Sequence, residues 1–389
     1  MATAPPRLSW RLIAASAFAL FALSCSGTTR APFLVDMAND FAVSLGATAN
    51  VIALNAVTWG IASILAGALS DRIGRKPFLV FGPISLAICT AAAALSQSYA
   101  VFAFWVTAAG LAAGSVSATV IAEVSSRVED RQRGRALGWT LAGQSMALLV
   151  GVPLATLLGA VIGWRGVHFC VAGAALAAGA ALFLTMRGPA EAGSVRRRAS
   201  ADWRAALSGR VMRLLTLGVA ERSCYSLAVT FFATYLLTAY SVTLAGLALP
   251  LAVFALGNIL GTLVGGQLAD RLPNRLLTFA AAMVCGAVIA LPLFLWQGGL
   301  PVTVALGFAF ILCTSMARPS LMAALTNVPD SIRGTVLGLN VTSSSVGWLG
   351  SSALGGLVIA EYGFAGFAPM AGGLALAGAA LAFASRRQA

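Results

Sequence analysis

Twelve apolar runs, separated by short polar segments, constrain what this chain can fold into more than any other feature. About 20 helical residues, at 1.5 Å each, cross a hydrocarbon core about 30 Å thick, and each run is close to or above that length. Helices rather than strands are expected, because a segment in lipid must satisfy its own backbone hydrogen bonds. The runs cover residues 11–37, 47–69, 78–95, 101–124, 137–162, 167–186, 211–239, 244–268, 276–296, 302–325, 336–359 and 364–384.

The composition agrees with a chain that faces lipid. It is 59% hydrophobic and 10% charged, whereas a soluble domain is about half apolar and a quarter charged. The net charge of +13 would suggest nucleic acid in a soluble protein, but here the basic residues lie between the apolar runs. We therefore expect a lipid bilayer as the surroundings and no nucleic-acid partner.

The positions of the basic residues predict the topology. Of the 25 lysines and arginines, 21 lie at the two termini or in segments that follow an even-numbered run. Because cytoplasmic loops carry an excess of Lys and Arg, this asymmetry predicts both termini in the cytoplasm. The expected location is the inner (cytoplasmic) membrane, crossed many times.

The chain repeats itself internally. The segment 67–76 recurs as 266–275, and the segment 133–138 recurs as 333–338, at offsets of 199 and 200 residues. Two matches at nearly one offset indicate duplication of a six-span unit, an arrangement that places a binding site between the two halves. We expect an N-terminal half over 1–186, a cytoplasmic linker over 187–210 and a C-terminal half over 211–389.

Two motifs resemble those of a known family. Residues 67–76 read Gly-Ala-Leu-Ser-Asp-Arg-Ile-Gly-Arg-Lys, which resembles the motif between the second and third spans of the major facilitator superfamily. The glycines and proline of 143–165 resemble the fifth span of the twelve-span drug:proton antiporter family, in particular its sugar- and arabinose-efflux branch. The resemblance implies the major facilitator fold, all-α, with twelve transmembrane helices as two six-helix pseudo-repeats.

The resemblance also implies a function. It predicts a secondary active transporter that exports a small molecule, a drug or metabolite, by alternating access and proton antiport, working as a monomer. Three arginines inside the runs favour an alternative, which is uptake or exchange of a small organic anion. The single histidine excludes an HExxH zinc site, and there is no GxSxG motif, so we expect no enzyme, no metal and no cofactor.

The repeated loop predicts a conformational latch. Asp71 can accept hydrogen bonds from a helix N-terminus, and Arg75 needs a carboxylate, for which Glu123 is the expected partner. Such a cluster would hold the halves together while the cavity opens outward; the alternative is a static cluster that only fixes topology. The predicted set is Gly67, Asp71, Arg72, Gly74, Arg75, Glu123, Asp270 and Arg271.

Apart from Arg11 and Arg213, which lie at the ends of runs and count with the cytoplasmic segments, five further ionisable residues lie inside runs, where a charge costs about 2.5–3.5 kcal/mol or more. Glu221 and Asp36 are candidate proton carriers, with Glu221 preferred because it lies nearer the midplane. Arg30, Arg222 and Arg318 are candidate ligands of an anionic substrate group in the cavity. The alternative for Glu221 is an internal salt bridge, for example with an arginine, that joins the halves.

Small residues recur every four positions in the fifth, eighth and eleventh runs, which favours close approach of helices. The resemblance implies that these runs line the seam between the halves, so we expect surfaces that slide during transport, with static packing as the alternative. The predicted set is Gly143, Gly151, Pro153, Gly159, Gly257, Gly261 and Gly347.

Overall fold

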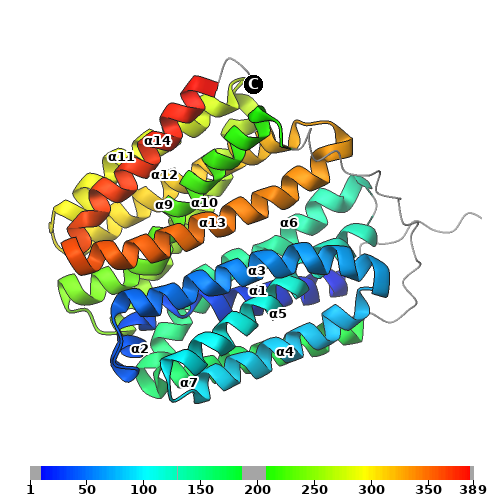
Figure 1. Cartoon of the computed structure of the whole chain (residues 1–389), viewed down its shortest axis with the longest axis horizontal. Coiled ribbons are helices and arrows are strands. Elements are labelled where there is room, and N and C mark those ends of the chain that lie inside the picture. The colour runs from blue at the N-terminus through cyan, green and yellow to red at the C-terminus, as the bar shows by residue number, and fades with distance from the viewer. Residues whose placement is uncertain (1–9, 129, 186–206, 386–389) are drawn as a thin grey trace, which may run out of the picture. The chain divides into compact units, whose positions relative to one another are not determined.

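The computed structural model describes residues 10–128, 130–185 and 207–385, and within these ranges the chain forms helices and turns without a strand (Figure 1). Most of the predicted linker 187–210 lies outside the described residues. The α-helices are α1 Trp10–Thr28, α2 Leu34–Asp40, α3 Leu45–Ile73, α4 Lys76–Leu95, α5 Tyr99–Ser126, α6 Asp130–Met146, α7 Val152–Thr185, α9 Gly209–Tyr240, α10 Ala248–Arg271, α11 Arg275–Leu295, α12 Leu300–Thr326, α13 Asp330–Tyr362 and α14 Phe367–Ser385. Short 3-10 helices cover Ala31–Phe33 (η1), Ala245–Leu247 (η3) and Phe364–Gly366 (η4), and a π-helical turn covers Ala147–Gly151 (η2).

Each predicted run falls on helix, and the interruptions have local causes. The first run is broken after α1 by η1, which contains Pro32. The π-helical turn η2 ends two residues before Pro153, whose ring has no N–H and would clash with the carbonyl four residues earlier; the wider turn accommodates it. Within α7 the helix changes direction at Gly163, where φ is 68°. That backbone conformation suits glycine, and it separates the fifth run from the sixth.

Nine helical segments within the described ranges are long and apolar enough to cross a membrane. One of them, Gly134–Thr185, contains the fifth and sixth predicted runs together. α9 and α13 are not among the nine, although the seventh and eleventh runs lie within them. The number of twelve spans therefore stays a prediction.

The chain forms two compact units. One consists of residues 1–30 and 54–197, and the other of residues 31–53 and 198–389. Residues 31–53, which contain η1, α2 and the start of α3, thus belong with the C-terminal helices rather than with the predicted N-terminal half. The division into two six-helix halves stays a prediction.

Each unit has its own core. In the first unit α4 packs against α5 and α7, and α1 packs against α6 and α7, around buried Leu20, Leu86 and Val116. In the second unit α11 packs against α12 and α14, α10 against α12, and α9 against α13. Phe231, Phe294 and Phe310 are fully or nearly fully buried there.

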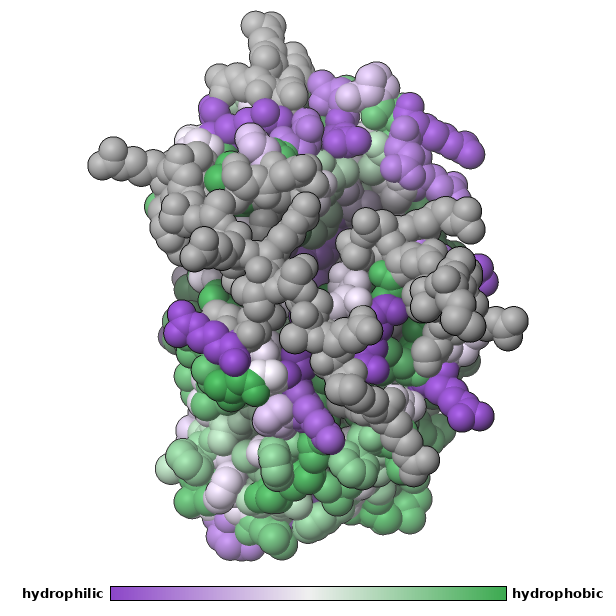
Figure 2. Space-filling model, turned by 90° about the vertical axis from the view of Figure 1, so that its right-hand side faces the viewer, coloured by the Kyte–Doolittle hydropathy of each residue, from purple (hydrophilic) through white to green (hydrophobic). Residues whose placement is uncertain are grey.

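Large apolar side chains also cover much of the outer surface. Val161 is 85% exposed, and Phe81 and Leu263 are more than half exposed. Figure 2 shows such apolar side chains gathered over part of the face that it draws, with hydrophilic ones in separate groups. Contiguous exposed apolar surface is rare on soluble monomers, whereas lipid tails solvate it without cost.

Candidate functional site

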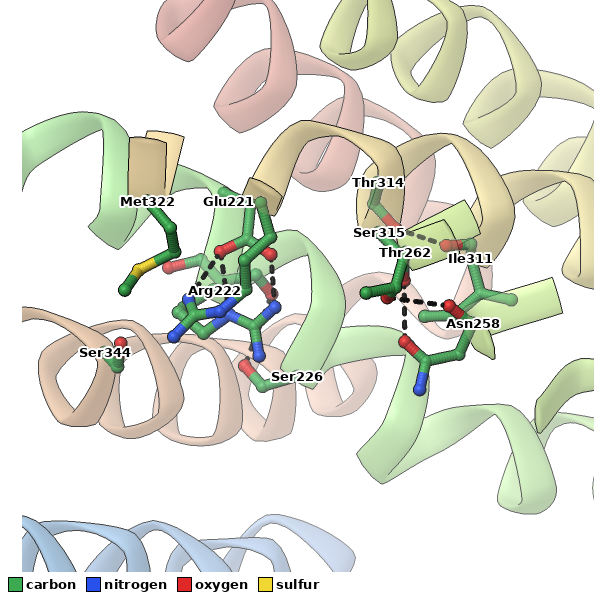
Figure 3. A network of polar contacts seen from close by, with 12 residues as sticks. Glu221, Arg222, Ser226, Asn258, Thr262, Ile311, Thr314, Ser315, Met322 and Ser344 are labelled. Carbon is green, nitrogen blue, oxygen red and sulfur yellow. Dashed lines mark hydrogen bonds and ion pairs between the residues drawn. The ribbon is translucent and has the colours of Figure 1, made fainter. Parts of the chain in front are cut away.

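A buried carboxylate and two arginines form the main charged cluster in the second unit. Glu221, in α9, is 0% exposed. Its Oε2 accepts hydrogen bonds from Nε of Arg222 at 2.7 Å and from Nη1 of Arg318, in α12, at 3.1 Å. Its Oε1 accepts a further bond from Nη2 of Arg222 (Figure 3). The sequence prediction gave these three residues separate roles, with a salt bridge between Glu221 and an arginine as the alternative, and the fold brings all three together.

The cluster carries one positive charge in excess, because two guanidinium groups face one carboxylate. Within the part of the chain that the structure describes, the bonds to Glu221 use Nε and one Nη of Arg222 and one Nη of Arg318. The other Nη of Arg222, with Nε and the second Nη of Arg318, can bind a further acceptor. The arginine side chains are 13% and 29% exposed, whereas that of Glu221 is 0% exposed.

Aromatic and neutral polar side chains surround the cluster. The guanidinium of Arg222 lies over the ring of Tyr225, 4.2 Å from its centroid, and Tyr225 meets Trp348 of α13 edge to face at 6.2 Å. Farther along the same unit, Ser315 donates to the side-chain carbonyl of Asn258 at 2.8 Å (Figure 3). The sequence prediction did not name these four residues, because uncharged polar and aromatic residues are common in spans.

The helices that carry the cluster are packed closely. The hydroxyl of Ser223 donates to the carbonyl of Gly347 at 3.3 Å, and Ser226 and Ser351 share a buried hydrogen bond. A Cβ at Gly347 would lie 2.7 Å from Cβ of Arg222. Gly347 thus fixes how closely α13 approaches the segment of α9 that holds Arg222.

The other two candidates lie elsewhere. Arg30 belongs to the first unit, is 1% exposed, and follows the end of α1. Asp36 is an exposed residue of α2. Proton transfer by Glu221 or Asp36 stays a prediction, but the salt bridges of Glu221 lie within one unit and do not join the two units.

The predicted partner of Arg75 is present. Nη1 of Arg75 lies 3.3 Å from Oε2 of Glu123 and also donates to the carbonyl of Ala122 and the hydroxyl of Ser126. Arg127, which the sequence prediction missed, is the first residue after α5, and its Nε lies 2.6 Å from the other oxygen of Glu123. We name Arg75, Glu123 and Arg127 the Glu123 cluster.

The remaining residues of the predicted latch are less engaged. Arg72, Asp270 and Arg271 are exposed, and the side chain of Asp71 lies outside the described side chains. A Cβ at Gly67 would meet no atom within 4 Å, and Gly74 has a φ of 91°, which ends α3 before α4 begins. Opening and closing of a latch stay a prediction.

The predicted glycines lie at close contacts between helices of the same unit. A Cβ at Gly143 would lie 2.0 Å from the carbonyl oxygen of Ala17 in α1, and one at Gly151 would lie 2.5 Å from the sulfur of Cys25. The corresponding distance is 2.3 Å from Gly261 to the carbonyl oxygen of Leu312. Pro153 and Gly159 are buried in α7. These contacts fit the static-packing alternative, while sliding at a seam between the halves stays a prediction.

The second unit also contains a cavity of about 560 Å³, lined among others by Tyr235, Phe294 and Tyr362. Tyr235 lies 14 residues beyond Glu221 on α9, about 21 Å at 1.5 Å per residue. Since the lining contains no charged side chain, we place the candidate site at Glu221 rather than at this cavity.

Comparison with known proteins identifies the family. The model of the Major Facilitator Superfamily matches residues 16–297 and 222–389. The chain is 28% identical over 343 residues to a probable 4-methylmuconolactone transporter of Cupriavidus pinatubonensis, covering 80% of this chain and 77% of that protein. It is 26% identical over 273 residues to a chloramphenicol resistance protein of Streptomyces lividans, covering 69% of each.

A solved structure has the same fold. A bacterial homologue of the human lysosomal transporter Spinster, in its inward-facing and occupied conformation, aligns with a TM-score of 0.77 over 99% of this chain and 98% of that chain. The sequence identity is 16%, so this likeness concerns the fold alone. With the family match over nearly the whole length, the helical fold and the lipid-facing surface agree: the chain is a multi-pass membrane transport protein and belongs to the Major Facilitator Superfamily.

Proposed function

We propose that this protein carries a small organic anion across the membrane by alternating access, with a proton as the coupling ion. The observation that carries the proposal is the excess positive charge of the cluster of Glu221, Arg222 and Arg318. One arginine would neutralise Glu221. A second arginine inside a span costs about 2.5–3.5 kcal/mol or more, and an anionic ligand offsets that cost.

The geometry suits a carboxylate ligand. Arg222 and Arg318 keep donors that Glu221 does not use, and a planar guanidinium binds a carboxylate through two parallel bonds. Aromatic surface lies next to Arg222, because the Tyr225 ring faces its guanidinium and Trp348 contacts Tyr225. A small acid with an apolar body therefore complements the site.

Glu221 would couple the anion to a proton. Protonation of Glu221 removes its negative charge and leaves both arginines for the ligand. At a separation of about 6 Å and an effective dielectric constant of about 20, removing one like charge strengthens anion binding by about 3 kcal/mol, or about a hundredfold. Proton and anion then bind together, which is symport, and an inward proton gradient drives uptake.

A second candidate is proton-coupled export of a drug or metabolite, which the sequence motifs predict first. The relative named as a chloramphenicol resistance protein supports it, whereas the relative named as a probable 4-methylmuconolactone transporter supports a metabolite as substrate. Whether transport is inward or outward, the excess positive charge of the cluster at Glu221 favours an anionic substrate over a cationic one.

We further propose the arrangement in the membrane. Twelve helices cross the inner membrane as two six-helix halves, 1–186 and 211–389, joined by the linker 187–210, with both termini in the cytoplasm, and the monomer is the working unit. The distribution of basic residues supports this orientation. The Glu123 cluster then lies at the cytoplasmic side, where it acts as a latch during alternating access.

The test is transport by the purified chain in liposomes under an imposed proton gradient. Labelled sugar acids, aromatic acids and lactone acids are compared with their neutral amides. An inward gradient is expected to drive accumulation of one acid class, and Arg318→Gln raises its KM at least tenfold. Arg213→Gln, on α9 like Arg222 and equal in charge loss, serves as the control and leaves KM unchanged.

Glu221→Gln separates coupling from binding. In this variant exchange of the acid across the membrane continues, but an imposed proton gradient no longer drives accumulation. The anion proposal fails if no acid accumulates and a neutral or cationic compound instead leaves loaded vesicles in exchange for protons. That outcome supports export.

A further inference from the structure

Arg30 is a buried charge without a partner in the described residues. It is 1% exposed and lies in the turn between α1 and η1. Its Nε and both Nη atoms are shielded from solvent, and none has a hydrogen-bond partner within the described part of the chain. A guanidinium stays charged in proteins, and a buried charge persists where a counter-charge or hydrogen bonds compensate it.

A second orphaned polar atom belongs to the same region. His168, in α7, is 2% exposed, and its Nδ1 lies 2.9 Å from the carbonyl oxygen of Trp164. Because a carbonyl only accepts, Nδ1 carries the hydrogen and the neutral ring presents a lone pair at Nε2. Nε2 is buried, and it too lacks a partner among the residues that the structure describes.

The charged side chains that act on the His168 ring are Arg30 and Arg165, and neither is an acid. Arg165 already donates to the carbonyls of Ala94 and Ser96, at 2.7 and 2.8 Å, and lies over the Trp164 ring. This leaves Arg30 as the guanidinium with free donors.

The helices around His168 contribute no acid either. α1 and α4 pack against α7, and their charged residues within the described range, Arg11 and Lys76, lie at the opposite ends of these helices; their other titratable residues are Cys25 and Cys89. From α5 the nearest titratable residue to Phe102 is Tyr99. On α2, which follows Arg30 and η1, Asp36 and Asp40 are exposed, and Arg30 has no hydrogen bond to either of them or to any other described residue. Within the described part of the chain, the counter-charge is therefore open to a bound species.

Aromatic walls enclose the site. The rings of Phe102 and Trp164 lie 6.3 and 5.3 Å from the His168 ring, centroid to centroid, and 5.5 Å from each other. Both are nearly fully buried. Exclusion of water by these rings strengthens the attraction between a guanidinium and an anion.

We propose that Arg30 and His168 form an occluded site for one small monovalent anion, a chloride ion or a carboxylate group, which binds together with a proton on Nε2 of His168. The lone pair of the neutral ring repels an anion, whereas the protonated ring donates to it. Before binding, the site carries the single charge of Arg30. After binding, two cations and one anion carry the same net charge, so loading does not add charge to the protein interior.

This site is separate from the cluster at Glu221, which belongs to the other unit. It also differs in access, since all three nitrogens of Arg30 are covered. The anion therefore enters only when the outer end of α1 moves, as alternating access requires.

The test uses the purified full chain in detergent, titrated with sodium chloride or sodium formate against sodium sulfate at equal ionic strength. Chloride or formate is expected to raise the melting temperature, sulfate is not, and a weakly buffered sample takes up about one proton per bound anion. Arg30→Gln is expected to weaken anion binding at least tenfold. An unchanged response in Arg30→Gln, or no response in the wild-type chain, overturns the proposal.

Three further variants make the result specific. His168→Gln supplies a neutral amide donor, so it is expected to bind the anion without proton uptake; continued uptake overturns the role of His168. If Arg30→Gln fails to fold, Arg30→Lys takes its place: it keeps the positive charge and is expected to bind the anion. Arg318→Gln is expected to leave the anion response intact, and loss of the response there assigns it to the Glu221 cluster and overturns the proposal.

Transport then distinguishes the two sources of the anion. If chloride is the native occupant, chloride activates transport of an organic substrate. If the site binds the carboxylate of the substrate, chloride competes with that substrate. Either result requires the positive charge of Arg30, so an effect of chloride on transport that persists in Arg30→Gln overturns the proposal.

Discussion

The contact of α10 with the backbone of α12 gives a prediction whose size can be worked out. A Cβ at Gly261 would lie 2.3 Å from the carbonyl oxygen of Leu312. Gly257 and Gly265, one turn away on either side, approach the carbonyl oxygens of Phe308 and Met316 in the same way, at 2.7 and 2.4 Å. We therefore expect Gly261→Ala to destabilise the second unit.

The expected loss follows from the displacement. To lengthen the contact from 2.3 to 3.0 Å, the two helices must separate by about 0.7 Å at this point. The obstructing atom is backbone, so no side-chain rotation relieves the clash. Overpacking of this kind costs about 1–3 kcal/mol, and alanine recovers about 0.8–1.0 kcal/mol of helix propensity. The net loss is about 0–2 kcal/mol, and relative to an alanine that gains helix propensity without a clash the loss is about 1–3 kcal/mol.

The assay is reversible unfolding in mixed micelles, followed by circular dichroism. Gly266→Ala is the matched control, because it lies on the same helix and its Cβ would meet nothing within 4 Å. The control is expected to be neutral or slightly stabilised. If Gly261→Ala is as stable as Gly266→Ala, close contact at Gly261 does not hold α10 against α12 and the reasoning is refuted.

Three other predictions concern single contacts. Glu123→Gln removes the charge that Arg75 and Arg127 share. If the cluster is a latch, initial-rate transport assays should show turnover about five- to tenfold lower with KM unchanged. A fall in turnover together with an equal rise in KM would point to a structural role instead. Ser226→Ala and Ser351→Ala break a buried hydrogen bond, so a double-mutant cycle in unfolding assays should give a coupling energy of about 0.5–1.5 kcal/mol. Arg165→Gln removes two bonds to carbonyls at the end of α4 and should cost about 1.5–3 kcal/mol, seen as a lower melting temperature, unless water replaces the guanidinium fully.

The helices were predictable because lipid leaves few alternatives for an apolar run. The fourth run, 101–124, lies inside α5, Tyr99–Ser126, with two residues of difference at each end. The eleventh run, 336–359, is less complete, since α13 begins at Asp330. Hydropathy detects the part of a helix that lipid surrounds, whereas a helix continues into polar surroundings as long as its backbone bonds hold.

The candidate site was predictable only as a set of residues. Glu221, Arg222 and Arg318 stand out because a charge in a span is costly, but their pairing depends on the rotation of α9 and α12 about their axes, which the sequence does not state. Asn258 and Ser315 gave no sequence evidence of their contact, since neutral polar residues are common in spans.

The internal repeat extends further in the structure than in the sequence. Arg75 donates to the carbonyl of Ala122 at 3.1 Å, and Arg275, 200 residues later, donates to the carbonyl of Ala323 at 3.1 Å. The first copy adds Glu123 as a partner, where the second copy has Ala324. The arginine-to-carbonyl bond is therefore common to both copies, and among the described side chains the ion pair with a carboxylate of the same span is found in the first copy.

The two copies also share a close helix crossing, but the glycines that permit it lie on different helices of the pair. In the first unit the glycines are on α5, and a Cβ at Gly114 would lie 2.2 Å from the carbonyl oxygen of Trp59 in α3. In the second unit the glycines are on α10, the counterpart of α3, and they face the carbonyls of α12, the counterpart of α5. A close crossing needs a missing Cβ on one of the two helices, and either helix can supply it. If only the crossing is selected, the glycines can lie on either helix of the pair. The sequences of these spans can then diverge between the copies, whereas the loop motifs keep their similarity.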